Sequence, residues 1–236
     1  MKSTGSLDTV GNREYGQYCG LARAAEVIGQ RWTLLILRDL LVAPRRYSEL
    51  VAGLPGIPTN LLATRLRELE ADGLIRREAR SGADRAIVYR PTARGSALIP
   101  TLDALSLWGA AELRTPRDGE IVTTAALVTG LRVAARSNVG PDPAIAFGCT
   151  VRIGEAVVHA VVENGDVLVA PGAHPEPDLQ ITGGAGFRDF LAGVTDPGAA
   201  AADGSIEVQG DPALLHQFVA IFQVPYSNWV PRTVPA

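Results

Sequence analysis

The sequence predicts two domains of different class: a mainly helical domain with one β-hairpin, followed by an α+β domain. Apolar residues recur at helical spacing over most of residues 15–114, whereas short β-patterned segments alternate with helices after residue 120. Residues 1–115 carry 16 basic and 12 acidic side chains (net +4), and residues 116–236 carry 6 and 13 (net −7). A basic half joined to an acidic half indicates two domains with different partners.

Composition and turn residues place the domain boundaries. We expect a flexible tail over residues 1–14, the first domain over 15–114, a linker over 115–120 and the second domain over 121–236. The N-terminus lacks an apolar signal region, and no run of about 18 apolar residues occurs. We therefore expect a soluble, cytoplasmic protein.

The first domain combines several helices with one hairpin. Leu62, Leu66 and Leu69 form the apolar face of its longest regular helix, and Gly73 suits the position after that helix. Turn residues 81–84 join two β-patterned segments. The expected helices span about residues 21–28, 32–42, 47–51, 59–72 and 92–113, the last with a kink at Pro100, and the expected strands span 74–78 and 86–90.

The order helix, tight turn, helix and hairpin between Arg46 and Arg90 is typical of a winged helix-turn-helix. In that fold the second helix enters the major groove of DNA, and a basic hairpin contacts phosphate or the minor groove. Arg65 lies between the two faces of that helix, so we expect it to reach a phosphate. The other candidate DNA-binding residues are Thr59, Asn60, Thr64 and Arg67 on the helix, and Arg76, Arg77, Arg80 and Arg85 on the hairpin. The alternative is an ordinary solvated surface.

Residues 19–109 resemble the HxlR-type family of winged-helix regulators. The matching segments are residues 28–32, 35–40, 46–50, 56–62, 65–77, 88–95 and 107–109. The resemblance implies a homodimer, paired through its first and last helices, on a pseudo-palindromic site in double-stranded DNA. Pro58, where the family has a small polar residue, and Gly20, where it has proline, depart from the pattern.

Cys19 precedes the first expected helix, where a thiol can have a lowered pKa and be reactive. Some members of the family that the sequence resembles sense oxidants or electrophiles with a cysteine at this place. Cys19 is thus a candidate redox switch, and the alternative is a small, partly buried apolar residue.

The second half contains no combination of residues typical of a catalytic or metal site. His159, His174 and His216 have no cysteine or carboxylate at metal-ligand spacing, so we interpret them as structural. The glycine-rich residues 182–186 lack the lysine of a phosphate-binding loop. We expect no cofactor and no enzyme. The expected helices span residues 124–136 and 187–192 and a last helix from Asp211-Pro212, and the expected strands include 156–163, 167–170, 179–182 and 206–209.

Residues 178–183, 187–193 and 203–212 resemble the sterol-carrier-protein-like fold. The resemblance implies an α+β domain with a tunnel for lipids or other apolar ligands. The candidate lining residues are Phe147, Phe187, Phe190, Phe218 and Phe222. The alternative is that these side chains form a solid core.

We therefore predict a dimeric, DNA-binding transcriptional regulator that responds to an apolar small molecule through the helix over residues 92–113. Three alternatives stay open. The protein could sense redox state through Cys19, or its second domain could only reinforce the dimer. It could also carry a lipid or metabolite and use the winged helix to bind a protein.

Overall fold

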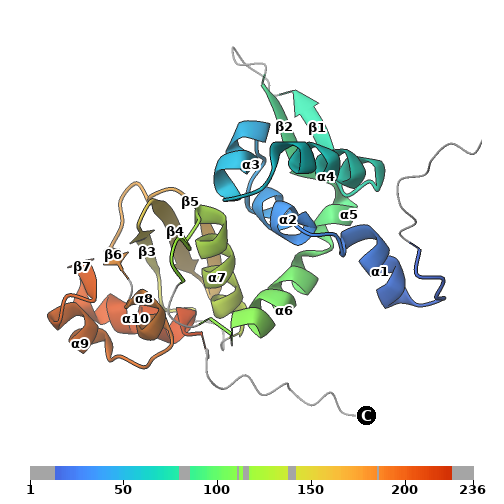
Figure 1. The fold of residues 1–236 in the computed structure, drawn as a ribbon. Coiled ribbons are helices and arrows are strands. Elements are labelled where there is room, and N and C mark those ends of the chain that lie inside the picture. Colours follow the sequence, from blue (N-terminus) through green and yellow to red (C-terminus); the bar gives the residue numbers. More distant parts are fainter. Residues whose placement is uncertain are drawn as a thin grey trace, which may run out of the picture.

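The chain folds into two domains in the computed structural model (Figure 1). Each domain has its own hydrophobic core. The structure describes residues 14–79, 86–110, 112–113, 117–137, 142–184 and 186–224. One core lies among the helices of the N-terminal domain and extends from Ile36 to Leu102. The other extends from Leu127 to Val224 and lies between a sheet and the helices that cover it.

The N-terminal domain is a helix-turn-helix followed by a two-stranded antiparallel hairpin, as predicted. A bridge between Arg45 and Tyr89 pairs a third segment with the hairpin. Its elements are α1 (Gly20–Ile28), α2 (Thr33–Val42), α3 (Tyr47–Gly53), α4 (Thr59–Ala71), β1 (Ile75–Ala79), β2 (Ile87–Pro91), α5 (Ala93–Ser96) and α6 (Ile99–Ala110).

The predicted single helix over residues 92–113 is two helices, so that prediction was wrong in its continuity. Helix α5 ends at Ser96, and α6 begins at Ile99 and ends at Ala110. Pro100 lies in the first turn of α6. Backbone N–H groups in the first turn make no hydrogen bond within the helix, so proline, which has no N–H, fits there. The chain therefore breaks before Pro100 instead of kinking at it.

Thr92 and Gly95 join the hairpin to α5. The Thr92 hydroxyl donates a hydrogen bond to the Gly73 carbonyl (2.7 Å) and accepts one from the Gly95 N–H (3.2 Å). A Cβ atom at Gly95 would lie 2.1 Å from the Leu74 carbonyl oxygen. The helix approaches the start of the hairpin so closely that only glycine fits at this position.

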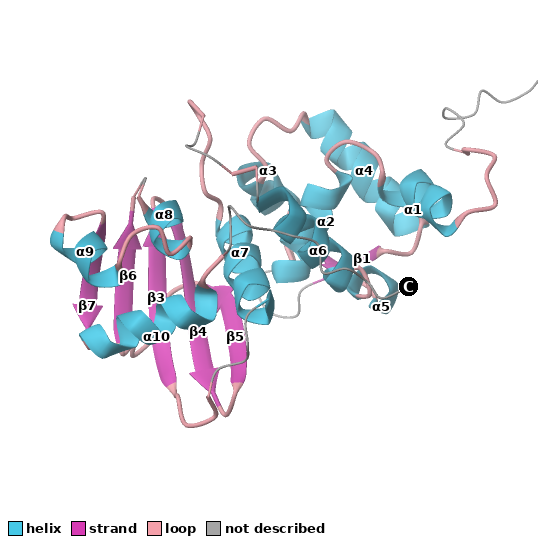
Figure 2. Cartoon of the chain, turned by 90° about the horizontal axis from the view of Figure 1, so that it is seen from below, coloured by secondary structure: helices cyan, strands magenta, loops and turns pink. Residues whose placement is uncertain are grey.

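The C-terminal domain is a five-stranded sheet with strand order β5-β4-β3-β6-β7, in which β3 and β6 are parallel and the other neighbours antiparallel. Helices α7, α8 and α10 cover one face of the sheet (Figure 2). The elements are α7 (Thr124–Ser137), β3 (Phe147–Ile153), β4 (Ala156–Glu163), β5 (Asp166–Pro171), β6 (Leu179–Gly183), α8 (Phe187–Leu191), α9 (Pro197–Ala202), β7 (Ile206–Gly210) and α10 (Pro212–Phe222).

Helix α9 is an element that the sequence analysis missed. Asp196 accepts hydrogen bonds from the N–H groups of Gly198 (2.9 Å) and Ala199 (3.1 Å), and Pro197 occupies the first helical position. The same Asp-Pro signal correctly predicted the start of α10 at Asp211. Six residues rich in alanine and glycine gave no apolar stripe that would reveal the helix.

Helix α7 connects the two domains. It contacts α2 and α6 of the N-terminal domain as well as β4 and β5 of its own sheet (Figures 1 and 2). Arg132 of α7 forms an ion pair with Asp103 of α6 at 2.6 Å, and both side chains are largely buried. Val42 and Ala110 of the N-terminal domain also pack on the C-terminal core. No helix of the described residues is long and apolar enough to cross a membrane.

The contact at Gly95 generates a stability prediction. Gly95→Ala should destabilise the protein by about 1–3 kcal/mol, because the added methyl group meets a backbone carbonyl that cannot rotate away. Gly130→Ala is the matched control, since nothing lies within 4 Å of its added Cβ in the middle of α7. That control should stabilise by up to about 1 kcal/mol. Urea unfolding measures both changes, and equal stability of the two variants would contradict the account.

Candidate nucleic-acid interface

Helix α4 is held with one face in the core and the opposite face outward. Leu62, Leu66 and Leu69 are at most 2% exposed. The Tyr47 hydroxyl of α3 donates a hydrogen bond to the Thr59 carbonyl at 2.7 Å, which fixes the start of α4 against the preceding helix. Gly56 has a φ of +80° in the turn between them, a value that glycine adopts without strain. The turn and the tyrosine therefore set the angle at which α4 is presented.

The first turn of α4 is exposed. Thr59 and Asn60 are both solvent-exposed, and Pro58 supplies no side-chain cap to the helix. The side-chain oxygen Oδ1 of Asn60 accepts a hydrogen bond from the Leu61 N–H at 2.8 Å, so the side-chain NH₂ group can donate outward. A helix N-terminus carries a partial positive charge that favours phosphate. This end of α4 can thus combine a base-edge contact with phosphate binding.

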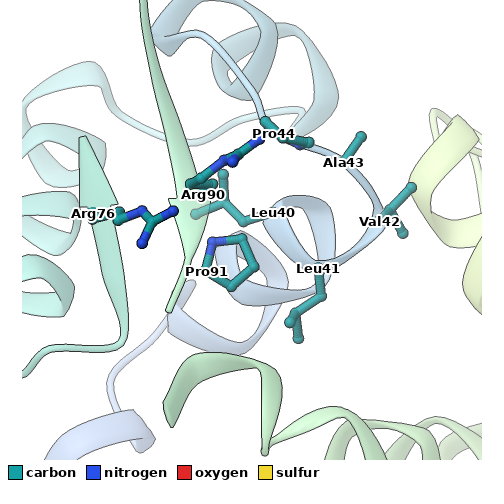
Figure 3. A pocket seen from close by; sticks show the side chains of 8 residues that line it. All are labelled: Leu40, Leu41, Val42, Ala43, Pro44, Arg76, Arg90 and Pro91. Atoms are coloured by element: carbon teal, nitrogen blue, oxygen red, sulfur yellow. The ribbon is translucent and has the colours of Figure 1, made fainter. Parts of the chain in front are cut away.

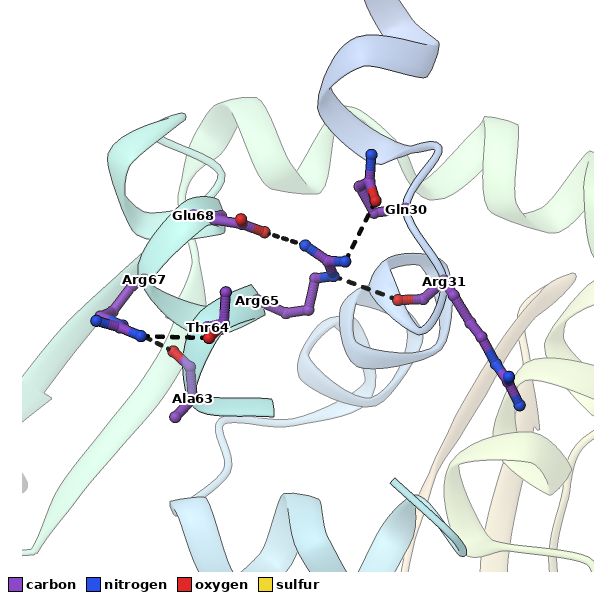
Figure 4. Close-up of polar contacts among 7 residues, drawn as sticks. All are labelled: Gln30, Arg31, Ala63, Thr64, Arg65, Arg67 and Glu68. Carbon is purple, nitrogen blue, oxygen red and sulfur yellow. Dashed lines mark hydrogen bonds and ion pairs between the residues drawn. The ribbon is translucent and has the colours of Figure 1, made fainter. Parts of the chain in front are cut away.

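Arg67 and Thr64 lie on the outward face of the same helix. The Arg67 guanidinium donates to the Thr64 hydroxyl (3.2 Å) and to the Ala63 carbonyl (3.3 Å), and the residue remains exposed (Figure 4). These are long contacts at the surface of one helix. A guanine edge or a phosphate oxygen could replace them at small cost.

The predicted phosphate contact of Arg65 does not fit its position. Its guanidinium pairs with Glu68 of α4 and reaches the segment between α1 and α2, where it donates to the Gln30 side chain (3.2 Å) and the Arg31 carbonyl (3.4 Å) (Figure 4). The side chain is only 14% exposed. Arg65 therefore ties α4 to the α1–α2 segment, which helical periodicity could not reveal because Gln30 lies 35 positions earlier.

The hairpin of β1 and β2 is the wing of the winged helix. Two of its arginines, which the sequence predicts as DNA-binding residues, are exposed and weakly paired. Arg77 contacts Glu70 of α4 at 3.0 Å, and Arg76 contacts Glu78 at 3.5 Å. Arg90 of β2, which was not among the predicted site residues, contacts the same Glu78 at 3.3 Å. Ion pairs this exposed contribute little to stability because solvent screens them, so phosphates can compete for these guanidinium groups. Arg80 and Arg85 lie outside the described residues.

The two cysteines differ in environment. Cys19 is exposed at the N-cap position of α1, where it makes no side-chain capping hydrogen bond. Cys149 lies buried in the central strand β3, and burial raises the pKa of its thiol to about 12. A thiol reacts as the thiolate, so Cys19 is the residue whose position allows redox chemistry.

The five phenylalanines predicted to line a tunnel all lie in the C-terminal core. Phe147, Phe187, Phe190, Phe218 and Phe222 are at most 6% exposed. Ring centroids lie 5.7 Å apart for Phe187 and Phe190, 6.3 Å for Phe190 and Phe218, and 4.7 Å for Phe218 and Phe222. Rings at these separations are in direct contact. Core packing therefore accounts for their apolar character.

His159 and His174 also make structural contacts. A ring nitrogen of His159 lies 3.1 Å from the Gly172 carbonyl oxygen, and the His174 ring packs against Gly148, where a Cβ would come within 2.7 Å of it. Within the described part of the chain, no three His, Cys, Asp or Glu residues form a group that could hold a metal ion.

Comparison with known proteins identifies similar regulators. Residues 27–116 match the HxlR-like helix-turn-helix family. An uncharacterized HTH-type transcriptional regulator of Methanothermobacter thermautotrophicus is 38% identical over 104 residues, covering 44% of this chain and 78% of the relative. One from Mycobacterium tuberculosis is 34% identical over 154 residues, covering 60% and 95%. Among solved structures, the oxidized form of the redox regulator HypR is 29% identical, with a TM-score of 0.37 and coverage of 42% and 99%.

The different surroundings of Arg65 and Arg67 generate a paired prediction. Arg65→Ala should lower stability by about 1–3 kcal/mol because it removes the hydrogen bonds to Gln30 and Arg31 and the ion pair with Glu68. Arg67→Ala should change stability by less than about 0.5 kcal/mol, since its contacts are exposed. Thermal unfolding of both variants checks this, and an unaltered Arg65→Ala protein would show that Arg65 does not brace α4.

Proposed function

The chain belongs to the HxlR-like helix-turn-helix family of transcriptional regulators, and on this premise we propose that it binds a pseudo-palindromic operator as a homodimer. The observation that carries the proposal is the exposed first turn of α4 beside a hairpin with exposed arginines. Thr59, Asn60, Thr64 and Arg67 are the proposed base-edge and groove contacts. Arg76, Arg77, Arg80 and Arg85 are the proposed backbone contacts. On this proposal the protein acts in the cytoplasm, where it binds chromosomal DNA.

Exposed apolar side chains on the first and last helices of the N-terminal domain support the dimer. Leu21 of α1 is 78% exposed, and Leu105 and Trp108 of α6 are 45% and 60% exposed. Tyr15 and Tyr18, just before α1, are also exposed. Large apolar groups that are exposed on these two helices suit a surface that another protein covers. We assign the occupant as a second copy, because a two-fold dimer presents two recognition helices to one duplex.

We propose that the C-terminal domain is the regulatory part, acting through α7 on α2 and α6. The Arg132–Asp103 ion pair and the packing of Val42 and Ala110 support this, since both would alter if the domains moved. Phe187, Phe190, Phe218 and Phe222 form a layer of contacting rings, here called the phenylalanine layer. An apolar ligand in this layer would need to separate rings that now touch. The sterol-carrier-like identity of the domain rests on the sequence resemblance alone.

A second candidate function is redox sensing at Cys19, which its exposure favours. Oxidation there would place a bulky or charged group at the start of α1, beside the proposed dimer surface. It would act by altering the pairing of the two subunits and hence the distance between their recognition helices.

DNA binding tests the leading proposal. Asn60→Ala should lose about 1–3 kcal/mol of affinity for the protein's own upstream DNA and little for random DNA, because it removes a base-edge contact. Arg77→Gln should weaken both and reduce the salt dependence by about one phosphate contact. Fluorescence anisotropy at several salt concentrations measures these effects, and repetition with a fatty acid present tests the apolar-ligand response.

Arg117→Gln is the matched control for charge, since Arg117 is 88% exposed and pairs loosely with Glu120 at 3.8 Å, outside α4 and the hairpin. It should bind both DNAs like the wild type. If upstream and random DNA bind equally well to every variant, the winged helix does not read sequence, and a protein-interaction role with a carrier function becomes the better account.

The dimer surface generates its own prediction. Trp108→Arg should convert the protein to a monomer and abolish tight operator binding, because a buried charge at the subunit contact lacks a partner. Leu168→Arg adds the same charge at an equally exposed leucine of β5 and should leave the dimer intact. Light scattering after gel filtration gives the molar mass, and a dimeric Trp108→Arg protein would place the subunit contact elsewhere.

Thiol chemistry tests the redox alternative. One cysteine should react with Ellman's reagent in the native protein and two after denaturation, because Cys149 is buried. Cys19→Ser should remove the fast reaction and any loss of DNA affinity on treatment with peroxide. A peroxide response that persists in Cys19→Ser would eliminate this cysteine as the sensor.

A further inference from the structure

A hollow of about 250 Å³ lies at the base of the hairpin, separate from α4 and from the phenylalanine layer. Arg76 comes from β1 and Arg90 from β2, and residues 40–44 at the end of α2 curve around the other side (Figure 3). The lining residues are Leu40, Leu41, Val42, Ala43, Pro44, Arg76, Arg90 and Pro91. Six aliphatic residues and two arginines thus line one small space.

The charges around the hollow do not balance. Within the described part of the chain, Arg76 and Arg90 pair with one carboxylate, that of Glu78, at 3.5 Å and 3.3 Å. The carboxyl end of α2 also reaches the hollow and contributes roughly half a negative charge. The hollow therefore has two full positive charges and about one and a half negative charges around it, which leaves a net positive charge. Glu78 is itself 45% exposed and can turn into solvent when a competing anion arrives.

We propose that this hollow binds a small organic acid with one carboxylate and a compact apolar part. A carboxylate matches the planar donor geometry of guanidinium groups. The leucine and proline side chains would cover the apolar part of the ligand. Sites for drug-sized ligands span about 300–1,000 Å³, so a volume of 250 Å³ restricts the ligand to the size of a single ring.

The position of the hollow connects the ligand to DNA binding, and this step rests on the proposed function. Arg76 is one of the proposed phosphate contacts, and Arg90 lies opposite it in the hairpin register. A carboxylate held by both would remove positive charge from the wing and weaken DNA binding. By linkage, DNA would weaken binding of the acid by the same factor. Val42, at the other wall, packs on the core of the C-terminal domain.

Benzoate is the test ligand, and the full chain without DNA is the first sample. Ligand-observed NMR titration should detect binding of benzoate. The affinity for its uncharged isostere benzamide should be about tenfold lower, because a charged hydrogen bond is lost. Arg90→Gln should weaken benzoate binding about tenfold. Ala43→Leu should also weaken it by filling the hollow while keeping both arginines. Thermal unfolding verifies that each variant is folded.

Arg77→Gln is the matched control, because Arg77 follows Arg76 on β1, points to the other face of the strand and pairs with Glu70. It should bind benzoate like the wild type. Equal binding of benzoate and benzamide, or unaltered binding by Arg90→Gln and Ala43→Leu, would overturn the site whether or not the protein binds DNA.

A second titration, against upstream DNA, tests the effector role. Saturating benzoate should weaken DNA binding of the wild type several-fold and leave Ala43→Leu unaffected. Benzoate that binds the hollow but leaves the DNA affinity of the wild type unchanged would overturn the link to the wing. Absence of DNA binding in every sample would instead count against the proposed function.

Discussion

The burial of one face of α4 is the constraint on which the proposed DNA interface depends. Three leucines at helical spacing fill the N-terminal core, and burying each contributes about 1.5–3 kcal/mol. Because they hold the helix by one side only, the polar residues on the opposite side must face solvent. Tyr47 then fixes the start of the helix, and Arg65 braces its middle against the α1–α2 segment. The packed leucine face therefore holds the proposed base-contacting residues in place.

Local sequence signals predicted most of the N-terminal domain. Leucine periodicity, the glycine after α4 and the turn residues of the hairpin are short-range features, and the structure has the corresponding elements within a few residues. The prediction failed where contacts between residues far apart in the sequence determine the position of a side chain. Arg65 looked like a surface cation because its partners Gln30 and Arg31 are far away in the sequence. The break between α5 and α6, by contrast, is a local effect of Pro100 in the first turn of α6.

In the C-terminal domain, β4, β5, β6, β7 and α10 followed from alternation and from the Asp211-Pro212 cap, whereas the buried central strand β3 was given no range and α9 has too few apolar residues to be recognised. Phenylalanines on two helices are compatible with a tunnel wall or with a core, because both require an apolar layer over a sheet. Only the ring separations distinguish these cases. The hollow beside the hairpin could not be predicted from the sequence either, because its lining combines the end of α2 with both hairpin strands.

Footprinting of the protein on its own upstream DNA tests the central claim most directly. Hydroxyl-radical cleavage reports each protected sugar, and the recognition helices of a two-fold dimer contact half-sites about one helical turn apart, ~34 Å. We expect two protected segments at that spacing on one face of the duplex, related by an approximate palindrome. Uniform cleavage at protein concentrations that saturate binding would show that α4 does not read DNA sequence.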